Sequence, residues 1–188
     1  MQENALALVA ELMALAAQTA PKGLGHDCLV TRVISGDLLG QLADEMVRYG
    51  QDTKKTNFDR DAENVRRSGA VLLVSVKGTK TLGLNCGACG NARCADLQSR
   101  PGPEFPGPLC AWRLIDLGIA LGSAARTASL LCADNRIMYR VGMVARKMGL
   151  LEGDVVVGIP VSAYSKNIYF DRAEQMPAGS QVSPTEQK

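Results

Sequence analysis

Four cysteines lie close together in the middle of the chain, at a spacing that suits a metal centre. Cys86, Cys89, Cys94 and Cys110 follow the pattern C-x2-C-x4-C-x15-C. Four thiolates can hold either a tetrahedral zinc ion or a cubane iron–sulfur cluster. Structural zinc sites favour two C-x2-C pairs, whereas this pattern contains one. The spacing therefore favours a [4Fe–4S] cluster over zinc.

The segment around these cysteines is also typical of a metal-bound loop. Gly87 and Gly90 allow the backbone to wrap tightly and to turn N–H groups toward sulfur. Residues from about 78 to 109 are rich in Gly, Cys and Pro and have little hydrophobic periodicity. Such a loop offers little core in which to bury ordinary cysteines. Cys28 and Cys132 stand apart at the ends of apolar segments, where we expect them to be small core residues.

The overall composition excludes several classes of protein. The chain has 188 residues and a net charge of +2, which gives no electrostatic footprint for nucleic acid or an anionic membrane. Aromatic residues make up 4% of the chain and leave few rings on which bases could stack. The longest uncharged piece of its most apolar segment, residues 117–125, is far shorter than the ~20 residues of a membrane span. The acidic start is unlike a secretory signal. We therefore expect a cytoplasmic protein whose thiols stay reduced.

The elements that must position the cysteines follow from periodicity. Helical spacing predicts helices at about 4–18, 38–50, 111–133 and 136–148, with a charged helix at about 57–67. Strands are predicted at 29–34, 70–76 and 154–159, the last one ended by Pro160. The run at 70–76 is apolar and rich in β-branched residues, so we expect this strand to be buried on both faces.

The long helix predicted at 111–133 carries two stripes. Its small side chains predict close packing against another helix inside the core, in preference to contact with a flat cofactor. These small residues are Gly118, Gly122, Ala125 and Ser129. A polar face is marked by Arg113, Asp116, Ser123 and Arg126.

The cysteine pattern resembles a known kind of cluster domain. The pattern C-G-x-C-G-x-x-x-C with a distant fourth cysteine is similar to the small [4Fe–4S] domain of corrinoid iron–sulfur proteins. It is also similar to that of the B subunits of membrane-bound electron-transport complexes. The resemblance implies that Cys86, Cys89, Cys94 and Cys110 are the cluster ligands.

The segments on either side resemble FMN-dependent nitroreductases. Residues 16–27 are similar to the helix and loop of that family that touch the flavin, 115–120 to the start of its central helix, and 149–160 to its closing segment. The resemblance implies an α+β, nitroreductase-like three-layer sandwich with a small Cys/Gly/Pro-rich insert, and a homodimer. It also implies FMN contacts at Lys22, Gly23, Gly25, His26 and Arg172. The asparagine of the family's flavin loop falls near residues 25–27 and is not reproduced.

Taken whole, residues from about 5 to 172 resemble a family of bacterial and archaeal proteins described as containing a ferredoxin domain. The recurring phrases of that family lie here at 19–22, 60–66, 82–90 and 134–139. The predicted organisation is an N-terminal part of a nitroreductase-like domain at 1–77, a [4Fe–4S] insert at 78–110, and the C-terminal part at 111–172. A polar tail at 173–188 is expected to be disordered.

Two functions compete on these grounds. The first is an iron–sulfur redox protein that transfers electrons through its [4Fe–4S] cluster to or from a bound flavin or an unnamed redox partner, as an oxidoreductase. The second is a non-enzymatic binding or sensing module stapled by zinc or a cluster. No catalytic residue is assigned: His26, the only histidine, lies in a loop where most histidines are merely solvated.

Overall fold

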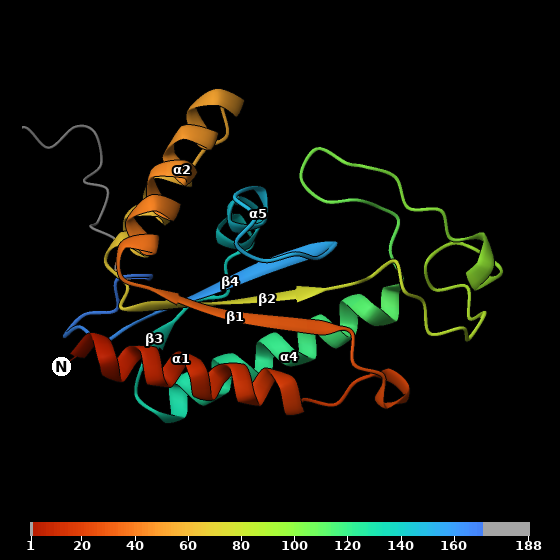
Figure 1. Ribbon diagram of the computed structural model, residues 1–188, viewed down its shortest axis with the longest axis horizontal. Coiled ribbons are helices and arrows are strands. Elements are labelled where there is room, and N and C mark those ends of the chain that lie inside the picture. Colours follow the sequence, from red (N-terminus) through yellow and green to blue (C-terminus); the bar gives the residue numbers. More distant parts are fainter. Residues whose placement is uncertain (1, 171–188) are drawn as a thin grey trace, which may run out of the picture.

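The structure is a computed structural model that describes residues 2–170, and Figure 1 shows their arrangement. The flavin contact predicted at Arg172 and the tail predicted at 173–188 lie outside the described residues. Five helices are described in this range: α1 (Gln2–Thr19), α2 (Asp37–Thr53), α3 (Phe58–Arg66), α4 (Ala111–Leu130) and α5 (Tyr139–Lys147). The strands described there are β1 (Leu29–Ser35), β2 (Ala70–Val76), β3 (Asp134–Asn135) and β4 (Val155–Ser162). Short 3₁₀ turns lie at η1 (Gly23–Gly25) and η2 (Cys94–Asp96).

The described strands form one antiparallel sheet in the order β1-β2-β4-β3. β2 is a central strand, and all seven of its residues are buried, which confirms the prediction of a strand covered on both faces. Its side chains alternate between two cores. Leu72 and Val74 point to one core, and Val71 and Leu73 to the other.

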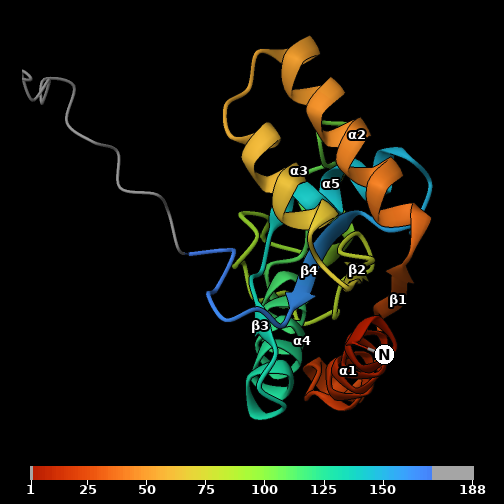
Figure 2. The same ribbon diagram turned by 90° about the vertical axis from the view of Figure 1, so that its left-hand side faces the viewer.

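Helices cover both faces of this sheet, so the described chain has three layers. α1 and α4 lie side by side on one face, while α2, α3 and α5 lie on the other (Figure 2). This arrangement confirms the predicted α+β three-layer sandwich. No helix among residues 2–170 combines the length and the apolar character needed to cross a membrane.

The prediction that Pro160 ends the last strand is wrong, because β4 runs on to Ser162. Gly158 exchanges two backbone hydrogen bonds with Met138 on the side of β4 that faces away from β2. Backbone groups alternate in direction along a strand, so the nitrogen of Pro160 faces that same outer side. β3 has two residues and pairs with Val161 and Ser162, beyond Pro160. The proline therefore costs the sheet no ladder hydrogen bond on its β2 side.

The segment between β2 and α4, residues 77–110, is irregular apart from η2 and one bridge between Arg100 and Gly107 in the described chain. It projects from the end of the molecule where α4 begins (Figure 1). Its Pro-rich part folds back onto the body. Glu104 accepts hydrogen bonds from Tyr49 Oη at 3.1 Å and from Lys55 Nζ at 2.5 Å. These contacts fix the far part of the segment to α2 and to the turn that follows it.

Candidate functional site

The four clustered cysteines lie at the end of the molecule where α4 begins. Cys86, Cys89 and Cys94 are in the irregular segment, and Cys110 is the residue that immediately precedes α4. Gly87 and Gly90 have φ angles of 74° and 86°, so both adopt the left-handed backbone conformation that glycine tolerates. The tight turns predicted around these cysteines are therefore present.

Three of the four cysteine sulfurs have an N–H donor beside them. The backbone N–H of Asn85 donates to Cys94 Sγ at 3.3 Å, and the indole Nε1 of Trp112 donates to Cys86 Sγ at 3.3 Å. The side-chain amide of Asn91 lies 3.8 Å from Cys89 Sγ. Such donors stabilise negative charge on sulfur. Accordingly, hydrogen bonds from the Ala88 backbone and from Trp112 lower the pKa of the Cys86 thiol.

These contacts connect the cysteines with one another and with α4. Asn85 Oδ1 accepts a hydrogen bond from the backbone N–H of Cys94 at 2.8 Å, so Asn85 and Cys94 hold each other reciprocally. Asn85 directly precedes Cys86, whose sulfur contacts Trp112 in the first turn of α4. The chain of contacts thus runs from Cys94 to the helix start that Cys110 caps.

The cysteine sulfurs are nevertheless not gathered into one coordination sphere. Within residues 2–170, no three His, Cys, Asp or Glu side chains form a group that could hold a metal ion. All six cysteines are free thiols. The donor set, four cysteines with N–H donors at three of them, fits the chemistry of a thiolate-bound metal centre. The assignment of these four residues as ligands stays a prediction.

A buried ion pair on α4 links the cysteine segment to the Pro21–Asp27 loop. Arg113 Nη1 donates to Asp116 Oδ2 at 3.2 Å, and both side chains are buried. Arg113 also donates to the backbone oxygens of Lys80 and His26, each at 3.0 Å. Asp116 Oδ1 accepts the N–H of Gly23 at 2.8 Å. The pair therefore ties two loops, far apart in sequence, to one helix.

Arg113 and Asp116, which the sequence places on a polar face of this helix, are both buried. Their charges are tolerated inside because each is paired and its remaining hydrogen-bonding groups meet backbone partners. Opposite charges three residues apart in an otherwise apolar helix were the available signal. The same carboxylate lies 3.8 Å from Cys28 Sγ. Burial raises the pKa of the Cys28 thiol, which confirms its expected role as a buried core residue.

The Pro21–Asp27 loop contains the predicted flavin contacts and has its own cavity. Lys22 and Gly25 line a cavity of about 360 Å³, together with Gln18, Ala20, Pro21 and Asp27. Gly25 has a φ of +66°. Gly23 and His26 reach α4 through their backbone groups, as described above, and the His26 side chain is exposed.

The charges of this loop are held by local hydrogen bonds. Lys22 Nζ donates to the backbone oxygens of Ala17 and Ala20, at 3.3 and 3.0 Å, and so caps the end of α1. Burial raises the pKa of the Asp27 carboxyl, but hydrogen bonds from Leu29 N–H and Gln18 and the charge of Lys22 outweigh it. The pKa of Asp27 therefore lies below its usual value, and the carboxylate is charged at neutral pH.

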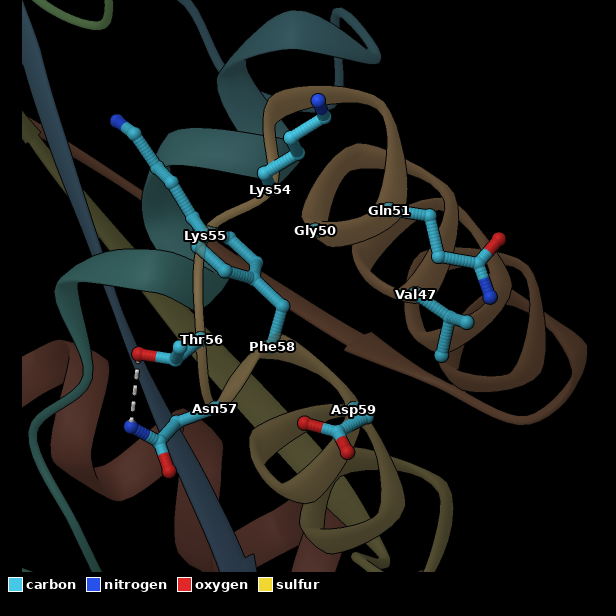
Figure 3. A pocket seen from close by; sticks show the side chains of 9 residues that line it. All are labelled: Val47, Gly50, Gln51, Lys54, Lys55, Thr56, Asn57, Phe58 and Asp59. Atoms are coloured by element: carbon cyan, nitrogen blue, oxygen red, sulfur yellow. Dashed lines mark hydrogen bonds between the residues drawn. The ribbon is translucent and has the colours of Figure 1, made fainter.

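A larger cavity, of about 460 Å³, lies where α2 turns into α3 (Figure 3). Its walls come from the last turns of α2 and from the connecting residues, where the Asn57 amide donates to Thr56 Oγ1 at 3.3 Å. None of the residues predicted from the sequence as site residues lines it. Lys55, one of its lining residues, is the partner of Glu104 noted above.

Several large apolar side chains are exposed on the α1–α4 layer. We call the exposed residues Leu8, Leu12 and Leu15 of α1 with Ile115 and Ile119 of α4 the apolar outer face. Gly118 and Gly122 are also exposed, and a Cβ atom at either position would meet nothing within 4 Å. The predicted packing of this small-residue stripe inside the core is therefore wrong for the described chain, because α4 turns the stripe outward.

Cys132 is exposed, so the prediction that it is a core residue is also wrong. α4 ends at Leu130, and Cys132 adopts a φ of 59° in the turn that follows. Cys132 therefore lies beyond the end of α4, where the packing of the helix does not bury it.

Comparison with known proteins identifies relatives of the sequence. Residues 106–172 match the family described as "uncharacterized protein containing a ferredoxin domain" (DUF2148). A protein of the archaeon Archaeoglobus fulgidus is 46% identical over 168 residues, which span 88% of this chain and 91% of the relative.

Several solved structures share the fold at low sequence identity. An FMN-bound nitroreductase from Desulfitobacterium hafniense has a TM-score of 0.57 and 14% identity, over 95% of this chain and 87% of that chain. A nitroreductase family protein from Clostridium novyi has a TM-score of 0.54 and 12% identity, over 86% and 77% of the two chains. An NADPH:FMN oxidoreductase from Vibrio harveyi, complexed with NAD⁺, has a TM-score of 0.54 and 13% identity, over 96% and 69%. These similarities confirm the nitroreductase-like architecture.

Proposed function

We propose a redox function for this chain, which belongs to the family described as containing a ferredoxin domain. In this proposal the protein is an iron–sulfur electron-transfer protein built on a nitroreductase-like scaffold. The observation that carries the proposal is the set of N–H donors beside three of the four clustered sulfurs. Neutral thiols do not need such donors, whereas an anionic thiolate cluster does. When bound, a [4Fe–4S] cluster supplies one-electron oxidation and reduction.

We assign the cluster to residues 78–110, an insert between the two halves of the scaffold at 1–77 and 111–172. Cys86, Cys89, Cys94 and Cys110 are its ligands. Asn85 and Trp112 orient two of these sulfurs through hydrogen bonds of 3.3 Å. Cys110 fixes the insert to the scaffold, because it precedes α4 and its N–H donates to Gly78 O at 2.9 Å.

We assign FMN to the cavity of the Pro21–Asp27 loop. Lys22, Gly23, Gly25 and His26 frame this site, and Arg172, outside the described residues, is a further phosphate contact. Support comes from the FMN in the structurally similar nitroreductase of D. hafniense. The Arg113–Asp116 pair contacts both this loop and the insert, so the two proposed centres share one support.

We propose that the protein is a homodimer that packs through the apolar outer face. Five exposed Leu and Ile side chains on two neighbouring helices are costly to leave in water. The exposed Gly118 and Gly122 allow another backbone to approach α4 closely.

We also propose that the protein is located in the cytoplasm, because this reducing compartment suits its six free thiols.

The alternative function is a non-enzymatic binding or sensing module in which zinc or a cluster staples the insert. One observation favours it: Lys22 Nζ is already hydrogen-bonded to the carbonyl oxygens at the end of α1. In that case the nitroreductase-like fold persists without a flavin.

Visible absorption of anaerobically purified protein, followed by extraction and identification of flavin, tests these functions. The proposal predicts broad visible absorbance from the cluster together with stoichiometric FMN. Cluster absorbance without flavin would reduce the function to one-electron transfer. Zinc without either chromophore would contradict the redox function and leave the stapled module.

A further inference from the structure

We propose that a cavity between β1 and the turn that follows α5 binds a small organic monocarboxylate with an apolar body. The cavity has a volume of about 390 Å³, which lies within the range of small-molecule sites in proteins. Its walls come from β1, from Lys77 directly after β2, and from residues 149–152. It shares no lining residue with the proposed flavin cavity, and the proposal depends on neither the cluster nor the flavin.

Two cationic side chains, Arg32 and Lys77, line this cavity. Arg32 Nη1 donates to Leu150 O at 2.6 Å, which fixes the guanidinium against the turn. A carbonyl oxygen carries no full charge, so this bond does not neutralise Arg32. Among the described residues, neither Arg32 nor Lys77 forms an ion pair. A held guanidinium with further N–H donors and a nearby ammonium group can together bind a carboxylate.

Glu152 lines the same cavity and limits the charge that a ligand can carry. Within the part of the chain that the structure describes, its carboxylate is not paired with either cation. Two cations and one carboxylate leave the lining with one net positive charge. This charge complements a monoanion, whereas the Glu152 carboxylate repels a second negative charge on the ligand.

The apolar part of the lining distinguishes an organic anion from an inorganic one. Val30 of β1 is 43% exposed, and Leu150 on the opposite wall is partly exposed. A hydrocarbon body that covers these two side chains removes apolar surface from water, which inorganic phosphate cannot do. The lining therefore favours a carboxylate attached to an apolar group.

A buried hydroxyl lies between the two walls. Ser75 is directly opposite Val30 in the β1–β2 pair, so the two side chains project from the same face of the sheet. Gly153, which follows Glu152, packs so closely on Ser75 that a Cβ atom there would lie 2.9 Å from Ser75 Oγ. Ser75 is fully buried, and its Oγ has no hydrogen-bond partner in the described chain. Such orphaned hydroxyls are rare, and a carboxylate that enters between the walls supplies an acceptor.

The test measures ligand binding to the full chain by isothermal titration calorimetry. The probes are hexanoate and inorganic phosphate, at mildly alkaline pH, where phosphate is a dianion. Lys77→Gln removes one cation at an exposed position, and Glu152→Gln removes the carboxylate. Lys166→Gln, at an exposed position that does not line the cavity, is the matched control. The NMR amide resonances of residues 149–152 report whether hexanoate binds at this place.

We expect one hexanoate site of equal affinity in wild type and Lys166→Gln, with shifted amide resonances at 149–152. Lys77→Gln should bind hexanoate about three- to tenfold more weakly, because a partly exposed contact to a charged group is lost. Phosphate should bind to wild type more weakly than hexanoate and should gain affinity in Glu152→Gln, where the repelling carboxylate is absent.

Three results would overturn the proposal. The first is folded wild type that does not bind hexanoate, or binds it without a change at residues 149–152. The second is equal hexanoate affinity in Lys77→Gln and Lys166→Gln. The third is phosphate binding to wild type as tight as that of hexanoate, which would contradict the monocarboxylate class. Iron, sulfide and flavin content of the same samples tests the redox function separately.

Discussion

The buried guanidinium of Arg113 donates to the carboxylate of Asp116 across 3.2 Å, and this pair joins the insert to the Pro21–Asp27 loop. Both residues lie one turn apart on α4, directly after the fourth clustered cysteine. The proposed cluster and flavin sites are therefore not independent attachments to the fold. They share a single polar support inside an otherwise apolar helix layer.

Replacing Asp116 with alanine should destabilise the protein severely. The change leaves Arg113 charged and buried without its carboxylate partner and removes the acceptor of the Gly23 N–H. Breaking a buried pair in this way costs about 3–5 kcal/mol. The free energy of unfolding in urea measures the effect. Arg126→Ala, at an exposed position of the same helix, is the control and should change stability by no more than about 0.5 kcal/mol.

A loss below about 1 kcal/mol for Asp116→Ala would mean that the pair does not support the two loops. In that event the link between the proposed centres would have to be sought elsewhere.

The proposed ligand set includes Cys94 and excludes Cys132. Cys94→Ser removes a proposed ligand and should abolish or strongly reduce metal content, because a thiolate of the set is lost. Cys132→Ser, at the exposed turn after α4, should keep full metal content. Metal analysis of the two purified variants gives the answer. Equal metal content in both would show that Cys94 is not a ligand.

A single charge in the apolar outer face should disrupt the proposed dimer. Ile119→Glu puts a carboxylate into the apolar outer face, where the proposed dimer would desolvate it without a partner. We expect this variant to be monomeric in sedimentation equilibrium at concentrations where wild type is dimeric. Val30→Glu, at an exposed position of β1, is the control and should stay dimeric. A dimeric Ile119→Glu variant would exclude this face as the interface.

Stability should fall at alkaline pH because of Tyr169. Its hydroxyl is buried against Ser68 Oγ at 2.9 Å, and burial raises the pKa of Tyr169 to about 12. The unfolded chain releases this proton near pH 10, so the stabilisation present below pH 10 is lost as the pH rises toward 12. The shift of two pH units corresponds to about 3 kcal/mol.

Urea unfolding of wild type and Tyr169→Phe between pH 9 and 12 isolates this contribution, since the other three tyrosines are common to both proteins. The two stability curves should converge as the pH rises. Parallel curves would refute the burial effect on Tyr169.

Hydrophobic periodicity predicted the helices and strands of the scaffold well, because the burial of apolar side chains determines where these elements form. The continuous apolar run at 70–76 coincides with β2, and the helix predicted at about 4–18 lies within α1. Local rules failed where partners from distant segments decide the outcome. The spacing of Arg113 and Asp116 within α4 could suggest a pair, but it does not identify the carbonyl oxygens of His26 and Lys80 that meet Arg113.

The same reason limits what could be predicted about the sites. The cysteine spacing alone identified the candidate ligands, but the contact of Cys86 with Trp112 depends on how the insert folds onto α4. Likewise, Pro160 ended the predicted strand because proline lacks an N–H, whereas the shortness of β3 makes that lack harmless.

Iron, acid-labile sulfide and zinc per chain, measured on anaerobically purified wild type, test the central claim most directly. A [4Fe–4S] centre held by Cys86, Cys89, Cys94 and Cys110 predicts about four iron and four sulfide per chain with negligible zinc. One zinc per chain without sulfide would contradict it.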